Sequence, residues 1–243
     1  MNMCRLTALF IAIVVLLSAG SASAGPGEFD TLIAKKGPKV KEVLYKPTLY
    51  RVAELPGLPV GRDAYEFLLD RPNLSLALAR LVDSRMDKYK VEVRPDGSAH
   101  VHDRDVLVGD MDVVSRTPGQ RIYYINGYWD FMLGIRFNGR MVLVADYTER
   151  PGSGGRQVDS RTRGYIKVDN AVVGVIARMM IYLFPGKVDA RIGRFAGAVR
   201  KVAEAVHGDP AGVYRKLSAA GEVPQSDLRE YRQFFLHDMA YSL

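Results

Sequence analysis

The sequence predicts an α+β fold, in which a curved antiparallel sheet of about six strands surrounds a long C-terminal helix and a helical tail follows. Two observations lead to this fold class. Residues 87–168 alternate polar and apolar side chains with a period of two, which is typical of half-buried β-strands. Residues 187–207 repeat apolar side chains at helical spacing instead. A run of strands followed by helices indicates an α+β protein rather than alternating α/β units.

The amino terminus has the pattern of a signal peptide. Arg5 supplies a positive charge, residues 6–17 form an almost unbroken apolar run, and an Ala-Ser-Ala sequence ends at Ala24. An apolar run of about 12 residues is too short for a membrane-spanning helix, which needs roughly 20. We therefore expect residues 1–24 to be removed by cleavage and the protein to be periplasmic or secreted.

The composition limits the chemistry of the mature chain. The only cysteine, Cys4, lies before the cleavage site, so no disulfide, thiolate metal site or cysteine nucleophile is expected. The formal net charge of +7 falls to +6 when Arg5 is removed. Outside the cytoplasm such a charge favours anionic lipid headgroups or acidic polysaccharide, and we expect no nucleic-acid partner. Apart from a lysine cluster between Lys35 and Lys46, the basic residues are dispersed, as on an ordinary solvated surface.

The first part of the mature chain has weak signals for regular structure. Residues 25–61 contain five prolines, which predict an extended segment without a core, with a short strand at residues 49–55. Residues 62–84 then begin with a capping-box pattern and show apolar side chains at helical spacing. Pro72 interrupts this spacing, so we expect two short helices or one kinked helix.

The sheet is expected from a series of strands separated by turn signals. The first, at residues 89–93, alternates tyrosine and valines with charged residues. Further strands are predicted at residues 106–114, 121–129, 134–137, 141–148 and 156–168. Asn138-Gly139 is a strong hairpin signal between two of them, and the glycines of residues 151–155 predict a flexible tip before the last. The last strand places small and apolar residues on one face and mainly charged residues on a wet face, which is typical of a curved sheet.

Three helical regions follow the strands. Residues 171–184 are apolar almost all round, which predicts either a gate beside a cavity that touches a membrane or a helix buried under the C-terminal tail. Residues 187–207 form the best amphipathic helix of the chain, with an apolar stripe that must cover a surface of similar length. After a break at Gly208, two shorter helices are expected at residues 211–220 and 226–240.

This order of elements resembles the helix-grip fold of the START-like superfamily, the lipid-transfer and polyketide-cyclase-like proteins. The resemblance covers roughly residues 60–207. Three parts of the sequence carry it, namely the paired short helices at 63–82, the long strand at 156–168 and the helical segment at 170–207. It is a match of architecture and pattern, with no signature motif. It implies a highly curved sheet that grips the long helix, with a hydrophobic cavity between them.

The resemblance also divides the chain. We expect a signal peptide at residues 1–24, an extended segment at 25–61, a helix-grip domain at 62–207 and a helical extension at 208–243. The export signal and the extension depart from the better-known members of the superfamily.

The resemblance implies a non-enzymatic protein that binds a hydrophobic ligand, expected to be a lipid, in an internal cavity, and so a lipid carrier. No cofactor and no metal are expected. Small side chains on the inner face of the last strand favour such a cavity, because they leave volume on a concave surface. Large side chains that fill this space as an ordinary core are the alternative. The residues expected to line the cavity are Tyr124, Trp129, Phe131, Ser160, Thr162, Ile166, Met179, Ile192, Phe195 and Val199.

An enzyme on the same scaffold, of a cyclase or hydrolase type, is a second hypothesis. Asp110 and Asp112 lie two apart on a strand, where like charges on one face raise the pKa of one carboxyl for acid–base chemistry. His100 and His102 also share a face, but the opposite face, with Val101, looks buried, which predicts solvated histidines rather than a metal site. The chain has no G-x-S-x-G, phosphate-binding glycine loop or H-E-x-x-H motif.

A structural envelope protein is a third hypothesis, in which the lysines between Lys35 and Lys46 dock the chain on anionic membrane. Asp146, Arg161 and Arg163 are candidates to orient the polar head of a ligand at the rim of the cavity, although exposed strand charges are the commoner case.

Overall fold

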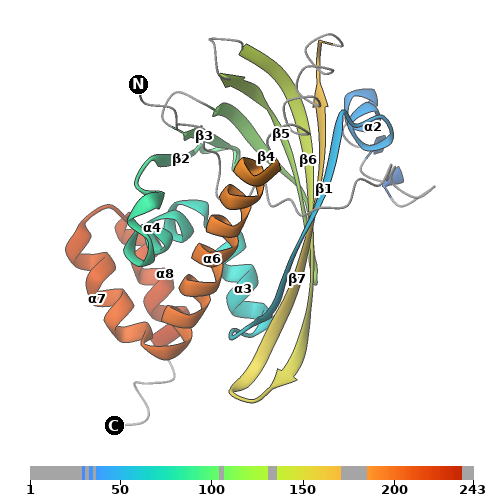
Figure 1. Cartoon of the computed structure of the whole chain (residues 1–243). Coiled ribbons are helices and arrows are strands. Elements are labelled where there is room, and N and C mark those ends of the chain that lie inside the picture. Colours follow the sequence, from blue (N-terminus) through green and yellow to red (C-terminus); the bar gives the residue numbers. More distant parts are fainter. Residues whose placement is uncertain are drawn as a thin grey trace.

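The computed structural model describes residues 29–30, 33–34, 37–103, 107–130, 136–170 and 185–236; within these ranges, the side chains of residues 107, 129–130 and 185–192 are not described. In this part of the chain a seven-stranded antiparallel sheet packs against helices, one of which is 24 residues long. The arrangement fits the α+β helix-grip fold that the sequence predicts (Figure 1).

The sheet has the strand order β1-β7-β6-β5-β4-β3-β2, and each neighbouring pair is antiparallel. The strands are β1 (Leu49–Leu58), β2 (Tyr89–Val93), β3 (Ala99–Asp103), β4 (Leu107–Thr117), β5 (Gln120–Asp130), β6 (Arg136–Gly152) and β7 (Gly155–Val168). Strand β1 pairs with β7, so the first and the last described strand along the sequence are neighbours in the sheet. The strand predicted at residues 49–55 is confirmed as β1, which runs three residues further.

The hairpin predicted at Asn138-Gly139 is wrong. Both residues lie inside β6, a continuous strand of 17 residues. Gly139 pairs with Gly127 on one side and with Val168 on the other, so ladder pairing on both edges overrides the local turn propensity. The predicted glycine-rich tip is confirmed, since β6 and β7 meet at a tight turn where Gly152 pairs with Gly155.

The described helices follow the predicted order, except for α2 and η1, which were not predicted. They are α2 (Pro38–Tyr45), α3 (Arg62–Leu69), α4 (Pro72–Val82), the short 3₁₀ helix η1 (Ser84–Met86), α6 (Pro185–Gly208), α7 (Pro210–Ala220) and α8 (Gln225–Leu236). Pro72 occupies the first turn of α4, where its missing N–H costs nothing, so residues 62–82 form two short helices rather than one kinked helix. None of the helices within the described ranges is long and apolar enough to cross a membrane.

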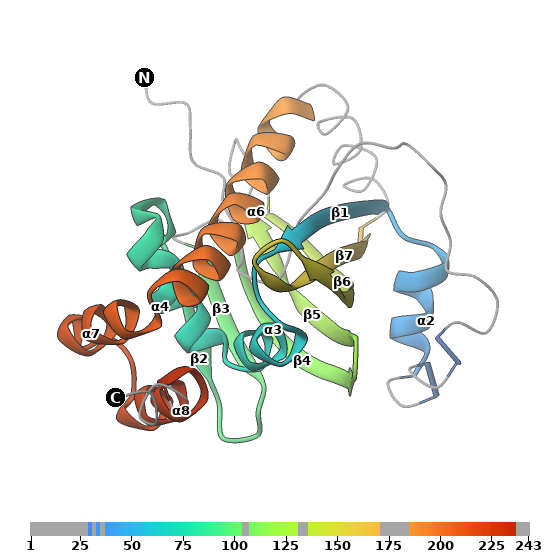
Figure 2. The same cartoon turned by 90° about the horizontal axis from the view of Figure 1, so that it is seen from below.

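The two faces of the sheet have different coverings. Helices α3, α4 and α6 lie on one side, here called the inner face, and α2 lies on the other side, here called the outer face (Figure 2). Because strand residues alternate between the faces, the register assigns each side chain to one of them. The alternation predicted for residues 156–168 is confirmed in β7, where buried Ser160 and its inner-face neighbours alternate with outer-face residues such as Arg161.

The amino-terminal segment contributes a core, contrary to the sequence prediction. Val40, Val43 and Leu44 of α2 are buried on the outer face, together with Phe29. Tyr165, predicted to lie on a wet face, is only 2% exposed because this helix covers it. Pro38 occupies the first turn of α2, and Pro56 lies where the pairing of β1 with β7 shifts register between Leu55 and Leu58, so both are compatible with regular structure.

The second half of α6 packs mainly on other helices. Phe195, Val202 and Val206 belong to one core with residues of α4, α7 and α8 and with the ends of several strands. The ring of Phe195 lies 5.1 Å from that of Tyr89 on β2. This half of the apolar stripe is therefore part of a packed core, whereas the sequence predicted that the stripe would face a cavity. The predicted helix at residues 171–184 lies outside the described residues.

Candidate functional site

The inner face carries an apolar floor made of strand residues. We call this group the inner floor: Ala99, Val101, Met111, Tyr123, Ile125, Met141 and Leu143. All are at most 3% exposed, and they come from the four neighbouring strands β3 to β6. No described helix residue belongs to the cluster, which separates the inner floor from the helix-rich core under the second half of α6.

The structure brings only some of the predicted lining residues together. Ser160, Thr162 and Ile166 lie on the inner face along β7, and Ile166 packs against the inner floor. Phe195 and Val199 of α6 belong to, or pack against, the helix-rich core instead. The remaining predicted residues, namely Phe131 and Met179 and the side chains of Trp129 and Ile192, lie outside the described part of the structure.

Tyr124 is on the wrong face to line an inner cavity. It pairs with Asp112 and Val142 and packs on the outer-face cluster around α2. Its neighbour Tyr123 points to the inner face and is 1% exposed. Two adjacent tyrosines look alike in a sequence, and only the pairing of β5 with β6 decides which one faces inward.

A network of buried and half-buried polar groups lies beside the inner floor, beneath α3. We call it the α3 polar cluster: Tyr65, Glu66, Asp70, Arg121, Tyr147 and Ser160. Arg121 is bidentate to Asp70, with Nε–Oδ1 and Nη2–Oδ2 distances of 3.0 Å each. It also donates to the Tyr147 hydroxyl at 2.7 Å and lies 3.3 Å from Glu66. Sequence analysis missed this cluster because its members are as far apart as residues 65 and 160.

The surroundings of Arg121 and Glu66 favour the ionised form of both side chains. Burial alone would lower the pKa of Arg121, but the hydrogen bonds and charge of Asp70 raise it above its ordinary value. Burial favours the neutral form of Glu66, but the N–H of Gly119, the Tyr147 hydroxyl and the charge of Arg121 together lower its pKa. The cluster therefore fastens α3 to the strands with a closed set of opposite charges.

The hydroxyl of Tyr123 has no hydrogen-bond partner in the described part of the chain, although it is buried. It sits at the border between the inner floor and the α3 polar cluster, close enough to Asp70, Tyr65 and Arg121 for their charges to act on it. Burial, and then the charge of Asp70, raise the pKa of Tyr123 above its ordinary value, so the group stays a neutral phenol. A neutral phenol can donate one hydrogen bond and accept others.

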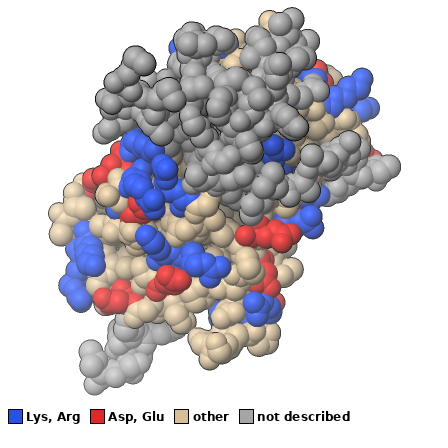
Figure 3. Space-filling view, in the orientation of Figure 1, with Lys and Arg blue, Asp and Glu red and all other residues tan. Residues whose placement is uncertain are grey.

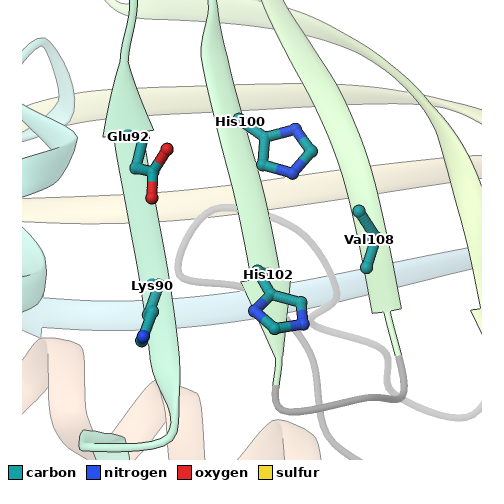
Figure 4. Close-up of a pocket in the computed structure, with 5 residues that line it drawn as sticks. All are labelled: Lys90, Glu92, His100, His102 and Val108. Atoms are coloured by element: carbon teal, nitrogen blue, oxygen red, sulfur yellow. The ribbon is translucent and has the colours of Figure 1, made fainter.

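The outer face carries a shallow hollow of about 350 Å³ near the β2 edge of the sheet. Lys90 and Glu92 of β2, His100 and His102 of β3 and Val108 of β4 line it (Figure 4). The two imidazoles project from the same face of β3, as predicted, while Ala99 and Val101 are buried on the inner face. His100 is half-exposed, in agreement with the prediction of solvated histidines.

Asp110 pairs with His100 rather than with a second carboxylate. His100 Nδ1 lies 2.8 Å from Asp110 Oδ1, and Arg94 donates to the same oxygen at 2.7 Å. The hydrogen bond of His100 and the charge of Arg94 lower the pKa of Asp110, so the expectation that Asp112 would raise the pKa of its neighbour is wrong for Asp110. Since Asp110 is ionised, the facing ring nitrogen carries the proton, and Nε2 of a neutral His100 is an acceptor.

The other charged candidates do not reach the inner face. Arg163 binds Asp146 at 2.9 Å and Arg161 lies 3.6 Å from Glu54, all on the outer face of β1, β6 and β7. They are therefore not placed to orient a ligand on the inner side of the sheet. Among the residues that the structure describes, no group of three or more histidine, aspartate, glutamate or cysteine side chains is arranged to hold a metal ion.

Basic and acidic side chains are interspersed on the face of the molecule seen in Figure 3, in the part that is described. Ion pairs also join separate elements: Arg71, just before α4, pairs with Glu230 of α8, and Arg80 of α4 pairs with Glu222 between α7 and α8. Lys39 and Lys41 of the predicted lysine cluster are exposed on α2, on the opposite side of the sheet.

Comparison with known proteins gives no family assignment. No protein-family model and no curated protein matches the chain. Among solved structures, a crystal structure of Ara h 8.0201 is 12% identical, with a TM-score of 0.30, over 62% of this chain and 97% of that one. A putative uncharacterized protein from Rhizobium leguminosarum is 13% identical, with a TM-score of 0.25, over 60% and 95%. At these values the fold assignment rests on the strand order and helices of the chain itself.

Proposed function

We propose that this protein binds a hydrophobic small molecule, of the size of a single lipid, on the inner face of its sheet. The observation that carries the proposal is the Tyr123 hydroxyl, which is buried beside an apolar floor and has no partner in the described residues. Buried polar groups in proteins are nearly always hydrogen-bonded, and leaving one unpaired costs about 1–3 kcal/mol. A polar group on a bound ligand supplies that partner while its apolar part contacts the inner floor.

The inner floor supports an apolar ligand by its composition. Its seven residues come from strands alone, and apart from the Tyr123 hydroxyl their side chains carry no oxygen or nitrogen. The floor residues are already at most 3% exposed, so the gain comes from the ligand, whose apolar chain contributes about 25 cal/mol for each Å² of its own surface removed from water. A contact of roughly 200 Å² thus contributes about 5 kcal/mol, which is a useful part of the binding free energy of a small lipid.

The proposal places the ligand beside the inner floor and not along the whole apolar stripe of α6. Phe195, Val202 and Val206 are already enclosed by other helices, so they are not free to line a ligand site. The ligand then contacts β3 to β6, and carriage of a lipid between membranes is the role we propose for the complex.

Native mass spectrometry of the protein purified from its own compartment tests this function directly. We expect a co-purifying lipid, or uptake of fluorescent fatty-acid or sterol-like probes by the protein after delipidation. Absence of any co-purified lipid together with no uptake of either probe contradicts the proposal.

We also propose that the protein is exported and that its mature form begins at Gly25. This rests on the leader pattern of the sequence, because residues 1–28 lie outside the described structure. N-terminal sequencing of protein from a periplasmic fraction checks the cleavage site. An intact amino terminus on protein found only in the cytoplasm contradicts the proposal.

A second candidate function is acid–base chemistry in the outer-face hollow. One observation favours it, namely the hydrogen bond between His100 and ionised Asp110, which orients the imidazole as an Asp–His pair does in a general base. The five residues lining the hollow include no serine, threonine or cysteine nucleophile. The hollow lies across the sheet from the inner floor, so its substrate is not the lipid bound there. Turnover of an added lipid ester that His100→Gln abolishes supports this function, and absence of turnover by wild-type protein counts against it.

A further inference from the structure

The charges around Tyr123 define a class of ligand, an inference that rests on the proposed function. We infer that the ligand meets the Tyr123 hydroxyl with an uncharged hydroxyl or carbonyl group, and not with a carboxylate or phosphate. The favoured ligands are then neutral-headed amphiphiles, such as long-chain alcohols, sterol-like alcohols or ketones.

The first argument is that Arg121, the cation among the described residues that acts on the Tyr123 hydroxyl, has no donor to spare. The Nε of Arg121 and one of its Nη2 hydrogens bind Asp70, and Nη2 also faces Glu66. Its Nη1 donates to the Tyr147 hydroxyl and to the backbone carbonyls of Thr117 and Gln120. Since a guanidinium has five N–H groups, this set of partners uses all of them. An arriving anion would have to break the bidentate pair with Asp70.

The second argument is the negative charge that already lies beside this hydroxyl. The carboxylates of Asp70 and Glu66 both face Arg121, and within the described ranges only Asp70 has a second cation, the exposed Arg116, at 3.2 Å. The charge of Asp70 raises the pKa of Tyr123, which means that this carboxylate disfavours a further negative charge at the hydroxyl. Burial of an anion without a paired cation is far more costly than burial of a hydroxyl or carbonyl.

The third argument concerns the next basic residue along the same row of the inner face. The row runs across the sheet as Arg51, Gly164, Leu143 and Tyr123, with one residue on each strand. Three strand spacings separate the backbone positions of Arg51 and Tyr123, which corresponds to about 14 Å. Arg51 is therefore too far away to pair with an anion that is hydrogen-bonded to Tyr123.

The phenol itself matches either kind of neutral group. It donates to a carbonyl oxygen, and it donates to or accepts from a hydroxyl. In the free protein no described residue is hydrogen-bonded to this hydroxyl, so removing it is not expected to weaken the fold. This gives a variant, Tyr123→Phe, that separates ligand recognition from stability.

The test compares two probes of the same chain length, 1-dodecanol and dodecanoate, at pH 8, where the acid is ionised. Binding to the delipidated full-length mature chain is measured by displacement of a fluorescent lipid. We expect dodecanol to bind at least about tenfold more tightly than dodecanoate. Tyr123→Phe should weaken dodecanol binding by about fivefold to tenfold, the loss of one hydrogen bond, and leave dodecanoate unchanged.

Tyr124→Phe is the matched control, because Tyr124 is the next residue and packs on the outer face against the α2 cluster. It should leave the affinity for both probes within twofold of wild type. The midpoint of urea unfolding is measured for both variants, and for Tyr123→Phe it should stay at the wild-type value or rise above it, because the variant removes an unpaired buried group. A clear fall of that midpoint would show that the hydroxyl has a partner in the free protein, and would overturn the inference.

The remaining outcomes distinguish the inference from the function on which it rests. If neither dodecanol nor dodecanoate binds, and no fluorescent lipid is taken up, the proposed function is refuted. If dodecanoate binds as tightly as dodecanol or more tightly, the function survives and the neutral-head inference is overturned. If dodecanol binds equally to wild type and Tyr123→Phe, the hydroxyl does not recognise the ligand and the inference is again overturned.

Discussion

Replacement of Arg121 by methionine should be the most damaging single change in the α3 polar cluster. The guanidinium side chain is 5% exposed and makes contacts with Asp70, Glu66 and Tyr147 at 2.7–3.3 Å. Methionine fills a similar volume but takes the buried cation away from both carboxylates and leaves Asp70 with only the exposed Arg116. Removing one partner of a buried ion pair costs about 3–5 kcal/mol. Asp70 and Glu66 are 28% and 23% exposed, so water reaches them and we expect the lower end, about 3 kcal/mol.

Urea unfolding of the mature chain, followed by the fluorescence of Trp129, measures this loss. With a slope of about 2 kcal/mol per molar urea, the midpoint should fall by roughly 1.5 M. Arg116→Met is the matched control, because Arg116 contacts the same Asp70 oxygen at 3.2 Å but is 53% exposed. An exposed pair contributes at most about 1 kcal/mol. Equal midpoints for the two variants would refute the argument that burial makes Arg121 the fastening residue.

Three further variants probe other parts of the fold. Leu44→Ala in α2 should cost about 2–5 kcal/mol, because Leu44 is fully buried; a near-neutral effect in urea unfolding would show that α2 is not part of the core. Gly127→Ala places a methyl carbon 2.3 Å from a neighbouring carbonyl oxygen and should cost about 1–3 kcal/mol, whereas Gly154→Ala at the open β6–β7 turn should be neutral by the same assay. Hydrogen bonds from Arg85 lower the pKa of Asp83 to about 2, so the ionised form stabilises the fold above pH 4 and this contribution is lost as the pH falls towards 2. We expect it to be about 1 kcal/mol, since Arg85 is 57% exposed, and Asp83→Asn should remove this part of the acid dependence of the urea midpoint; an unchanged dependence contradicts the assignment.

Local patterns in the sequence are enough to predict most elements of the fold. Alternation of apolar residues predicted the strands of the antiparallel sheet, and Pro72 and Gly208 marked real helix boundaries. Prediction failed where pairing partners outweigh local propensity. Asn138-Gly139 has the sequence of a hairpin turn but lies inside β6, which pairs with β5 on one side and β7 on the other. The proline-rich segment before Gly61 forms regular structure because β1 pairs with β7 and α2 packs on the outer face.

The candidate site was harder to predict than the fold, because it depends on contacts between distant residues. Asp70 and Arg121 are 51 residues apart, and only the docking of α3 on β5 brings them together. To predict that Tyr123 faces inward, one needs the register of the β4–β5 and β5–β6 pairs. Its neighbour Tyr124 is the same type of residue but faces the other side of the sheet. Histidines 100 and 102 could be placed from alternation alone, but the partner of His100 at Asp110 follows from the β3–β4 register.

The pairing of β1 with β7 has a consequence for how the chain acquires its structure. Leu49 meets Ile166, so this edge of the sheet is finished only after the polypeptide has been synthesised past that point. Loop closure over such a separation is slow compared with local helix formation. A newly made chain accordingly grows by more than a hundred residues after Leu49 before the contact that holds its first strand in the sheet can form.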